Sequence, residues 1–356
     1  MSETVEAPAR IELGNYLGGE WRGALSGETY EKRNPMRPDQ VVAEVPACDE
    51  SDVDAAVAAA EKAFPAWAAT PAPQRGNLLV KAAEVVDRRV EQVAAEMTRE
   101  MGKPLREARL EAARAAAILR FFGGEGYRPL GELSQQSLTG GPVYTMRRPL
   151  GVVGLITPWN FPAAIPTWKL APALAYGNTV VLKLASEAPL TGLRLAESIA
   201  EAGLPPGVLN VLTGSGLKVG GPLVRDPRVR AISFTGSVPV GQSVRDEATK
   251  LGKRVQLELG GHNPLIVLAD AKLDAAVEAA YAGAFWSAGQ KCTATRRIFV
   301  QDAVYESFRQ KLLDRIARGK VGDPADPGTE VGQSSTRSSL TKSWTRSSAA
   351  GAKAAK

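Results

Sequence analysis

The sequence predicts an α/β protein in which a doubly wound parallel sheet is followed by a second, incomplete α/β domain. Continuous apolar runs at 152–156 and 179–182 are typical of strands buried on both faces of a sheet. Segments with the length of helices alternate with these and later apolar runs, which is the pattern of a parallel sheet covered by helices. With 356 residues, 44% of them hydrophobic, the chain is long enough for two domains.

Residues 1–139 are predicted to form a mainly helical N-terminal part, entered through a few short strands. Ser51 to Asp54 have the pattern of a capping box and are expected to open an alanine-rich helix. Three further helices are predicted: one at about 73–92, a short one that ends near 101–102, and one at 104–122. Residues 140–150 are expected to form a hairpin arm, because their side chains alternate as in a strand.

The doubly wound unit is predicted to span residues 151–259. Its elements alternate: strand 152–156, helix 167–176, strand 179–182, helix 189–202, strand 208–212, helix 216–224, strand 231–234, helix 238–250 and strand 254–258. Ligands of such sheets bind at the carboxyl ends of the strands. Three polar features fall at those ends: the segment that begins at Thr157, the side chain of Lys183, and the turn at Gly236.

Residues 260–332 are predicted to form a partial second domain around Cys292, one of two cysteines in the chain. This cysteine separates a predicted helix at 273–288 from a predicted strand at 296–300. A thiol in such a connection, close to Gly289 and other small residues, can be held rigidly with open space before it, as a nucleophile requires. A buried structural thiol is the commoner fate of a free cysteine, so this stretch alone leaves both interpretations open.

Composition excludes several classes of function. No apolar stretch is long enough for a membrane span, and the polar, acidic start is not a signal peptide, so we expect a cytoplasmic protein without a membrane partner. Two cysteines and one histidine argue against a disulfide framework and a histidine-based metal site. Five of the basic residues behind the net charge of +6 lie within 333–356, where no acidic residue occurs, so the remainder carries only +1. We therefore expect no nucleic-acid partner.

Two polar residues stand where strands end. Asn160 follows the rigid pair Pro158 and Trp159, and an amide fixed in this way can donate to an oxyanion, although asparagine in a loop is usually only a turn former. Glu258 ends a strand, where carboxylates are commonly solvated. Its apolar neighbours predict partial desolvation, which would raise its pKa toward that of a useful base.

The turn from Phe234 to Gly241 joins a buried strand to a helix N-terminus, whose N–H groups and dipole suit an anion such as a pyrophosphate. Its glycines, Gly236 and Gly241, have four residues between them and do not follow the G-x-G-x-x-G spacing, so the turn alone is a weak signal. Lys183 could donate to ribose hydroxyls from its strand end, although a solvated lysine is the commoner case there.

The stretches Thr-Pro-Trp-Asn-Phe-Pro at 157–162, Leu-Glu-Leu-Gly-Gly at 257–261 and Phe-Trp-Ser-Ala-Gly-Gln-Lys-Cys-Thr-Ala at 285–294 together resemble the aldehyde dehydrogenase superfamily in order and spacing. The longer similarity over 101–331 is nearest to the semialdehyde dehydrogenases, especially the 2-oxoglutarate semialdehyde type. The resemblance implies oxidation of a small-molecule aldehyde with NAD or NADP as coenzyme. It also implies a homo-oligomer that the hairpin arm helps to build.

The resemblance also assigns roles to residues. Cys292 would attack the aldehyde, Asn160 and the Cys292 N–H would hold the oxyanion, and Glu258 would activate water. The implied coenzyme contacts are Thr157, Pro158, Trp159, Lys183, Ser186, Glu187, Phe234, Thr235, Gly236, Ser237, Gly241 and Leu259. The implied substrate entrance is lined by Phe161, Ile165, Trp168 and Trp286. Ser186 stands where the family often has a carboxylate that would repel a 2′-phosphate, so NADP is expected to be accepted.

The resemblance extends over about residues 10–332. Residues 333–356 contain seven serines and no apolar periodicity, which predicts a disordered tail outside the family pattern, and the family's downstream Glu-x-Phe-Gly-Pro motif is missing from the sequence. We therefore expect a chain that is C-terminally truncated or frameshifted. Three alternatives stay open: an aldehyde dehydrogenase, an inactive remnant that at most binds nucleotide, and a thiol esterase that uses Cys292 and Glu258 without coenzyme.

Overall fold

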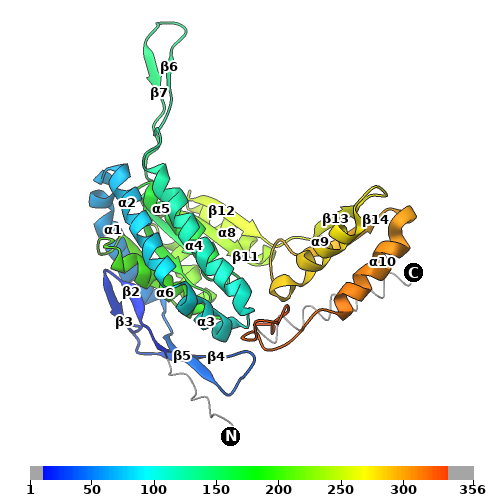
Figure 1. Cartoon of the computed structure of the whole chain (residues 1–356). Coiled ribbons are helices and arrows are strands. Elements are labelled where there is room, and N and C mark those ends of the chain that lie inside the picture. Colours follow the sequence, from blue (N-terminus) through cyan, green and yellow to red (C-terminus); the bar gives the residue numbers. More distant parts are fainter. Residues whose placement is uncertain (1–10, 336–356) are drawn as a thin grey trace.

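The computed structural model describes residues 11–335, and its centre is a seven-stranded sheet (Figure 1). Five strands run parallel in the order β12-β11-β8-β9-β10. They are β8 (Val152–Ile156), β9 (Thr179–Lys183), β10 (Leu209–Leu212), β11 (Val229–Gly236) and β12 (Arg254–Leu259). The antiparallel strands β2 (Asn15–Leu17) and β3 (Glu20–Arg22) extend the β10 side. The predicted α/β class and the parallel centre of the sheet are confirmed.

Helices cover both faces of this sheet because its central strands bury side chains in both directions. Val153 and Val180 face one core, which is covered by α2 (Ala72–Arg88), α3 (Val90–Met101), α4 (Leu105–Glu125), α5 (Ala164–Ala175) and α6 (Pro189–Glu201). Val152 and Val181 face the other core, which is covered by α1 (Glu50–Ala69), a π-helical turn (Gly216–Gly220), α7 (Gly221–Arg225) and α8 (Val238–Lys250). Residues 152–156 and 179–183 are all buried, as their unbroken apolar runs predict.

The first helix begins earlier than its sequence pattern predicts. Its capping residue is Asp49, whose carboxylate accepts the N–H of Ser51, while Asp52 reaches back to the N–H of Asp49. The expected capping box at 51–54 is therefore wrong by two residues. Asp52 is buried and also accepts the N–H of Leu25, a tertiary contact that fixes it at the third helical position.

The projecting arm also differs from its predicted bounds. It is a hairpin of β6 (Leu133–Gln135) and β7 (Pro142–Tyr144), which stands clear of the body in Figure 1. The first strand of the arm thus lies within the stretch assigned to the helical part, and the predicted range 140–150 contains only the second strand. A separate sheet near the N-terminus contains β1 (Ile11–Glu12), β5 (Val41–Pro46) and β4 (Thr29–Arg33).

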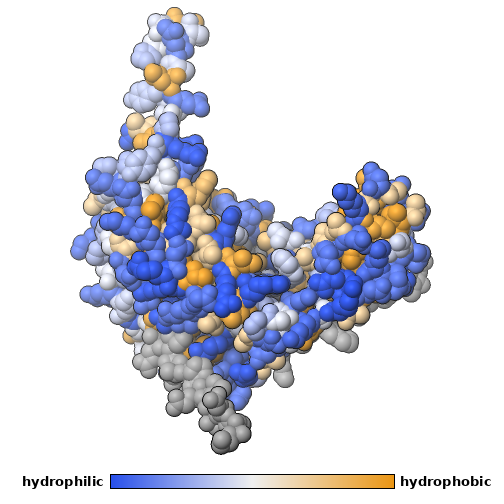
Figure 2. Space-filling model, viewed as in Figure 1, coloured by the Kyte–Doolittle hydropathy of each residue, from blue (hydrophilic) through white to orange (hydrophobic). Residues whose placement is uncertain are grey.

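The second unit contains the parallel strands β13 (Asn263–Val267) and β14 (Thr295–Val300) with α9 (Leu273–Phe285) and α10 (Asp302–Ala317). Its core is small and centres on Val267, Val277, Ala280 and Phe308. Apolar side chains that include Ile266 and Phe299 remain exposed, and orange patches mark this unit in Figure 2. The predicted helix at 273–288 ends at Phe285, where a short 3₁₀ turn follows (Trp286–Gly289).

The described chain continues three residues into the predicted tail. Ser335 is buried, its hydroxyl donates to the Met101 carbonyl at 2.7 Å, and its N–H donates to Gln290 at 3.1 Å. The prediction of disorder from residue 333 is therefore wrong for 333–335, which these hydrogen bonds fix against the body. The rest of the predicted tail, 336–356, lies outside the described residues. Within residues 11–335, no helix combines the length and apolar composition needed to cross a membrane.

Candidate active site

The predicted polar features meet at one edge of the sheet. The paired positions Ile156 and Lys183 end neighbouring parallel strands, and Gly236 and Leu259 pair at the ends of β11 and β12. The segment after β8 is joined to β9, since the N–H of Thr157 donates to the Lys183 carbonyl at 3.2 Å. Thr157 is buried, whereas the next two residues, Pro158 and Trp159, are half-buried.

The turn between β11 and α8 packs closely on β12 and leaves the N-terminus of α8 exposed. Ser237 is the capping residue of α8, and both its side chain and the first residues of the helix are exposed. A Cβ added to Gly241 would lie 2.4 Å from the Leu259 side chain, so only glycine lets the helix pack this closely on β12. Thr235 is buried, and its hydroxyl has no hydrogen-bond partner within the described chain. An exposed helix N-terminus beside an unpaired buried hydroxyl fits the phosphates of a dinucleotide.

Lys183 and its neighbours form the other half of this edge. Burial lowers the pKa of Lys183, and the nearby Glu187 carboxylate opposes that shift. Ser186 is half-buried, and its hydroxyl donates to the Gly214 carbonyl at 2.8 Å. The side chain of Ser186 is therefore partly engaged by the protein itself.

Cys292 is exposed, in the turn that follows the 3₁₀ segment after α9. Two non-glycine residues before it, Ser287 and Ala288, have left-handed φ angles of 56° and 52°, which side chains other than glycine rarely adopt. On the other side, the Asn263 amide donates to the carbonyls of Cys292 (2.5 Å) and Ala294 (3.1 Å). The Asn263 amide thus holds the turn that carries the thiol, and the two strained residues lie just before it.

The structure brings Asn160 to the cysteine segment. Its side-chain Nδ2 donates to the Gln290 carbonyl at 2.8 Å, across 130 positions of sequence and two residues before Cys292. Its side-chain Oδ1 is buried without a partner among residues 11–335. The amide therefore presents one engaged N–H, and its second N–H is available for another acceptor.

Glu258 corrects one expectation. Its side chain is exposed and accepts a hydrogen bond from the Gln256 amide at 2.8 Å, so the predicted partial desolvation is wrong. The reason is that β12 is the last strand of the sheet: Leu257 and Leu259 pack against the core under α8, while the alternate positions Gln256 and Glu258 face outward.

The sequence pattern does not reveal Lys169, which lies beside this strand. It sits within the apolar helix α5, and burial lowers its pKa to about 8, opposed by the charge of Glu258. Its ammonium group donates to Ser233 at 2.7 Å and to Gln256 at 3.1 Å. Lys169, Gln256 and Glu258 thus form a polar chain at the sheet edge. A lysine in an apolar helical pattern could have signalled it, since such a lysine needs partners when buried.

The four predicted substrate residues separate in the structure. Trp168 and Trp286 are each 40% exposed, whereas Ile165 is only 1% exposed and packs in the interior, so its expected place at an entrance is wrong. Phe161 is half-buried, and the ammonium of Lys103 lies 4.0 Å from the centre of its ring. An isoleucine in the first turn of α5 faces the core because the helix packs on the sheet there.

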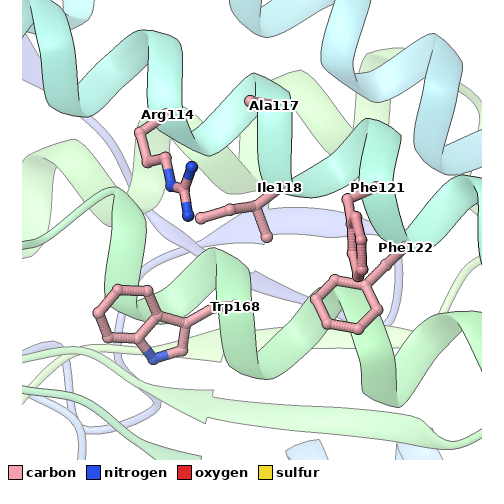
Figure 3. A pocket seen from close by; sticks show the side chains of 6 residues that line it. All are labelled: Arg114, Ala117, Ile118, Phe121, Phe122 and Trp168. Atoms are coloured by element: carbon pink, nitrogen blue, oxygen red, sulfur yellow. The ribbon is translucent and has the colours of Figure 1, made fainter.

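A pocket of about 360 Å³ opens between α4 and α5, with Trp168 on its wall (Figure 3). The other lining residues all come from α4 and are mainly apolar: Arg114, Ala117, Ile118, Phe121 and Phe122. In Figure 3 the guanidinium of Arg114 points toward the side of the pocket where the Trp168 indole lies. The pocket therefore combines apolar walls with one positive charge.

Known proteins match the chain over most of its length. The model of the aldehyde dehydrogenase family matches residues 21–356, a range that continues past residue 332. An alpha-ketoglutaric semialdehyde dehydrogenase of Bacillus subtilis is 45% identical over 326 residues, which cover 92% of this chain and 67% of that protein. The NADP(+) succinate-semialdehyde dehydrogenase GabD of Escherichia coli is 42% identical, with 89% of this chain and 65% of that protein covered.

A solved NAD-dependent aldehyde dehydrogenase from Sinorhizobium meliloti superposes with a TM-score of 0.93 at 36% identity, over 96% of this chain and 68% of that one. The chain thus spans about two thirds of the length of the proteins it matches. The parallel sheet, the exposed thiol and the Asn160 amide that binds its segment agree with this kinship, and the semialdehyde dehydrogenases expected as relatives from the sequence are among these matches. The chain therefore belongs to the aldehyde dehydrogenase family and is by lineage an NAD- or NADP-dependent oxidoreductase.

Proposed function

We propose that this chain oxidises an aldehyde, of the semialdehyde class, to the carboxylic acid through a covalent intermediate on Cys292. The observation that carries the proposal is the hydrogen bond from Asn160 to the Gln290 carbonyl, because it supports a role for this amide as oxyanion donor to the exposed thiol two residues further on. The test is formation of reduced coenzyme by the purified chain with a semialdehyde and NAD⁺ or NADP⁺. A chain that forms none would overturn the proposal.

The coenzyme would lie across the carboxyl edge of the sheet. Its phosphates would meet the α8 N-terminus at Gly236 and Ser237, where the buried Thr235 hydroxyl still lacks a partner. Its ribose would meet Lys183. When bound, NAD⁺ or NADP⁺ supplies the two-electron acceptor for the oxidation. The remaining proposed contacts follow the same edge: Thr157, Pro158, Trp159, Ser186, Glu187, Phe234, Gly241 and Leu259.

The residues of the chain would perform the rest. The Cys292 thiolate forms a C–S bond to the aldehyde carbon, and the carbonyl electron pair moves to oxygen, where Asn160 and the Cys292 N–H stabilise it. Oxidation of that carbon would break its C–H bond, the hydrogen leaving with two electrons for the coenzyme held at the sheet edge, and the C=O bond would re-form as a thioester on Cys292. Glu258 then takes a proton from water as the water oxygen attacks the thioester, the C–S bond breaks, and the acid leaves with the thiolate restored. Lys169 donates a hydrogen bond to Gln256 and interacts with the charge of Glu258, so it would help to orient this base.

Glu258→Gln should slow deacylation without removing acylation, because the amide cannot accept the proton of water. We expect a rapid burst of about one reduced coenzyme per site, followed by steady turnover that is 10²- to 10⁴-fold slower. Stopped-flow absorbance of the reduced coenzyme measures both phases. Unchanged steady turnover would remove Glu258 from the role of base, and Gln256→Ala serves as the control for the neighbouring side chain.

Ser186→Glu should weaken NADP⁺ selectively, because a carboxylate would face the 2′-phosphate. We expect the Kd for NADP⁺ to rise at least about tenfold while that for NAD⁺ changes less than about threefold, measured by fluorescence titration. Ser186→Ala is the matched control, since it removes the hydrogen bond to Gly214 without adding charge. Equal loss of both coenzymes in the glutamate variant would show that residue 186 lies away from the 2′ position.

The pocket between α4 and α5 favours an aldehyde with a distal carboxylate. Its apolar wall suits a short carbon chain, and the Arg114 guanidinium suits a carboxylate at the far end. The names of the relatives from Bacillus subtilis and Escherichia coli, both semialdehyde dehydrogenases, support the same substrate class. Phe161, Trp168 and Trp286 would form the path between this pocket and the thiol.

Arg114→Gln should raise the KM for a carboxylated semialdehyde such as succinic semialdehyde by about tenfold or more, because a charge-assisted hydrogen bond is lost. The KM for butanal, which has no carboxylate, should stay within about twofold. Arg120→Gln is the control on the same helix, where Arg120 pairs with Asp87 instead of lining the pocket. A parallel rise for both aldehydes would contradict the assignment of Arg114 to the carboxylate.

Two further proposals concern the setting of the enzyme. The exposed hairpin β6–β7 carries the apolar side chains Leu133, Val143 and Tyr144, which supports its proposed role in a homo-oligomer. Both cysteines are free thiols, which supports the cytoplasm as the compartment.

A further inference from the structure

Three charged side chains at the start of α4 contact both halves of the proposed site. Glu107 and Glu111 lie four residues apart on one face of α4, and Lys103, in the link before the helix, pairs with Glu111 on that face. In Figure 1 the first turns of α4 lie beside the end of α9, the helix that leads to Cys292. None of these residues belongs to the machinery proposed above.

The first contact fixes the Asn160 loop. The ammonium of Lys103 forms an ion pair with Glu111, and their side chains are only 1% and 3% exposed. The same ammonium donates to the main-chain carbonyl of Asn160 at 2.7 Å. The second carboxylate oxygen of Glu111 accepts the N–H groups of Ala163 (2.9 Å) and Ala164 (3.1 Å). This buried pair therefore holds the loop at Asn160 itself and at the residues just after it.

The second contact fixes the cysteine turn. Glu107 accepts the N–H of Ser287 at 3.1 Å and its hydroxyl at 2.6 Å. Ser287 is the first of the two residues with left-handed φ angles, a conformation that persists only where its surroundings hold it. The carboxylate thus supplies an outside contact for the strained turn that leads through Gln290 to Cys292.

We propose that Lys103, Glu107 and Glu111 are positioning residues that hold the Asn160 amide and the Cys292 turn in register for the oxyanion. The two contacts leave one rigid helix and end on the two segments that the Asn160–Gln290 hydrogen bond joins. We call these three residues the clamp. Lys103 and Glu111 hold the Asn160 loop, Glu107 holds the Cys292 turn, and together they set the separation between the oxyanion donors and the thiol. This inference rests on the proposed function, since it assigns the clamp to that same site.

The activity test separates positioning from mere stability. The double variant Lys103→Met/Glu111→Met removes both buried charges together, because losing one would leave the other unpaired. We expect kcat per titrated active site to fall about ten- to hundredfold, which is less than the loss of about 10²- to 10³-fold when an oxyanion donor is removed outright. The Kd for the coenzyme should stay within about twofold of the parent. When Asn160 is already alanine, the same double substitution should lower kcat by less than about twofold. The reason is that the Lys103–Glu111 pair is proposed to act through the Asn160 amide, which is then absent.

Glu107 is tested separately by a conservative and a severe change. Glu107→Ala should lower kcat about tenfold or more, whereas Glu107→Gln, which keeps an acceptor for Ser287, should recover most of that loss. Glu91→Ala is the matched control, because Glu91 pairs with Arg109 between α3 and α4 on the exposed surface. Hydrogen exchange followed by mass spectrometry gives a readout independent of activity. The amides of 160–164 in the methionine pair, and of 286–294 in Glu107→Ala, should exchange at least about tenfold faster than in the parent.

Unchanged kcat per active site in an active parent would overturn the clamp and leave the proposed function intact. The clamp would also be overturned if the double substitution lowered kcat by the same factor with and without Asn160→Ala, since that would indicate a structural role alone. Should the double variants fold poorly, the two Glu107 variants decide the matter, because the Glu107 side chain hydrogen-bonds to a single residue of the turn, Ser287. An inactive parent chain would overturn the proposed function itself, and with it the catalytic meaning of the clamp.

Discussion

Cys292→Ala is expected to abolish aldehyde oxidation, with a loss of at least about 10⁴-fold in kcat, because no other described group can form the carbon–sulfur bond at this site. Cys48, the second cysteine, cannot replace it. Cys48 is buried, accepts a hydrogen bond from Asn15 at 2.8 Å, and has a pKa raised to about 12 by burial, so it remains a thiol at neutral pH. The measurement is reduced-coenzyme formation by equal amounts of the parent and the variant.

The controls for this substitution follow from the same structure. Coenzyme binding should be nearly unchanged in Cys292→Ala, because the sheet edge and the α8 turn hold the nucleotide. Cys48→Ala should keep full activity per folded molecule, and iodoacetamide should inactivate it as fast as the parent, since the exposed thiol is the one alkylated. Dehydrogenase activity that survives in Cys292→Ala would end the proposed mechanism.

The sheet could be predicted from the sequence because each central strand is marked by its own run of apolar residues. An apolar run such as 152–156 stays buried whichever helices cover it, and the polar residues that follow must then lie at the carboxyl edge. The same reasoning places Asn160, Lys183 and Gly236 correctly, because parallel strands bring their ends to one side. The amide of Asn160 meets the Cys292 segment as the family resemblance implies.

The errors arise where a neighbour distant in sequence decides the outcome. Asp52 joins the helix cap because Leu25 also binds it, and Ile165 turns inward because α5 lies on the sheet. Glu258 is exposed because β12 is the last strand of its sheet, a fact that the alternation of its own residues does not contain. The start of α4 is the clearest case: the helical pattern around Glu107 and Glu111 does not show that these carboxylates bind Ser287 and Ala163.

Asn160→Ala is expected to lower kcat by 10²- to 10³-fold, because the oxyanion loses a donor that is held in place before the reaction. The substitution should lower kcat and leave coenzyme affinity unchanged. The Asn160 side chain hydrogen-bonds to Gln290 and not to the α8 turn, where the coenzyme phosphates would bind. The KM for the aldehyde should change less than about threefold, because the uncharged carbonyl of the substrate gains little from the donor before the bond to sulfur forms. Steady-state kinetics with saturating coenzyme gives both constants.

Loss of the hydrogen bond to Gln290 is a second effect of this substitution and needs its own control. The Gln290 side chain also accepts the main-chain N–H of Ser335, so the turn keeps a contact that does not involve Asn160. Gln290→Ala removes this side-chain acceptor but keeps the main-chain carbonyl that Asn160 binds, and its kcat should stay within about threefold of the parent. If Asn160→Ala lost no more activity than Gln290→Ala, the amide would be a support for the turn, and the oxyanion would depend on main-chain donors alone.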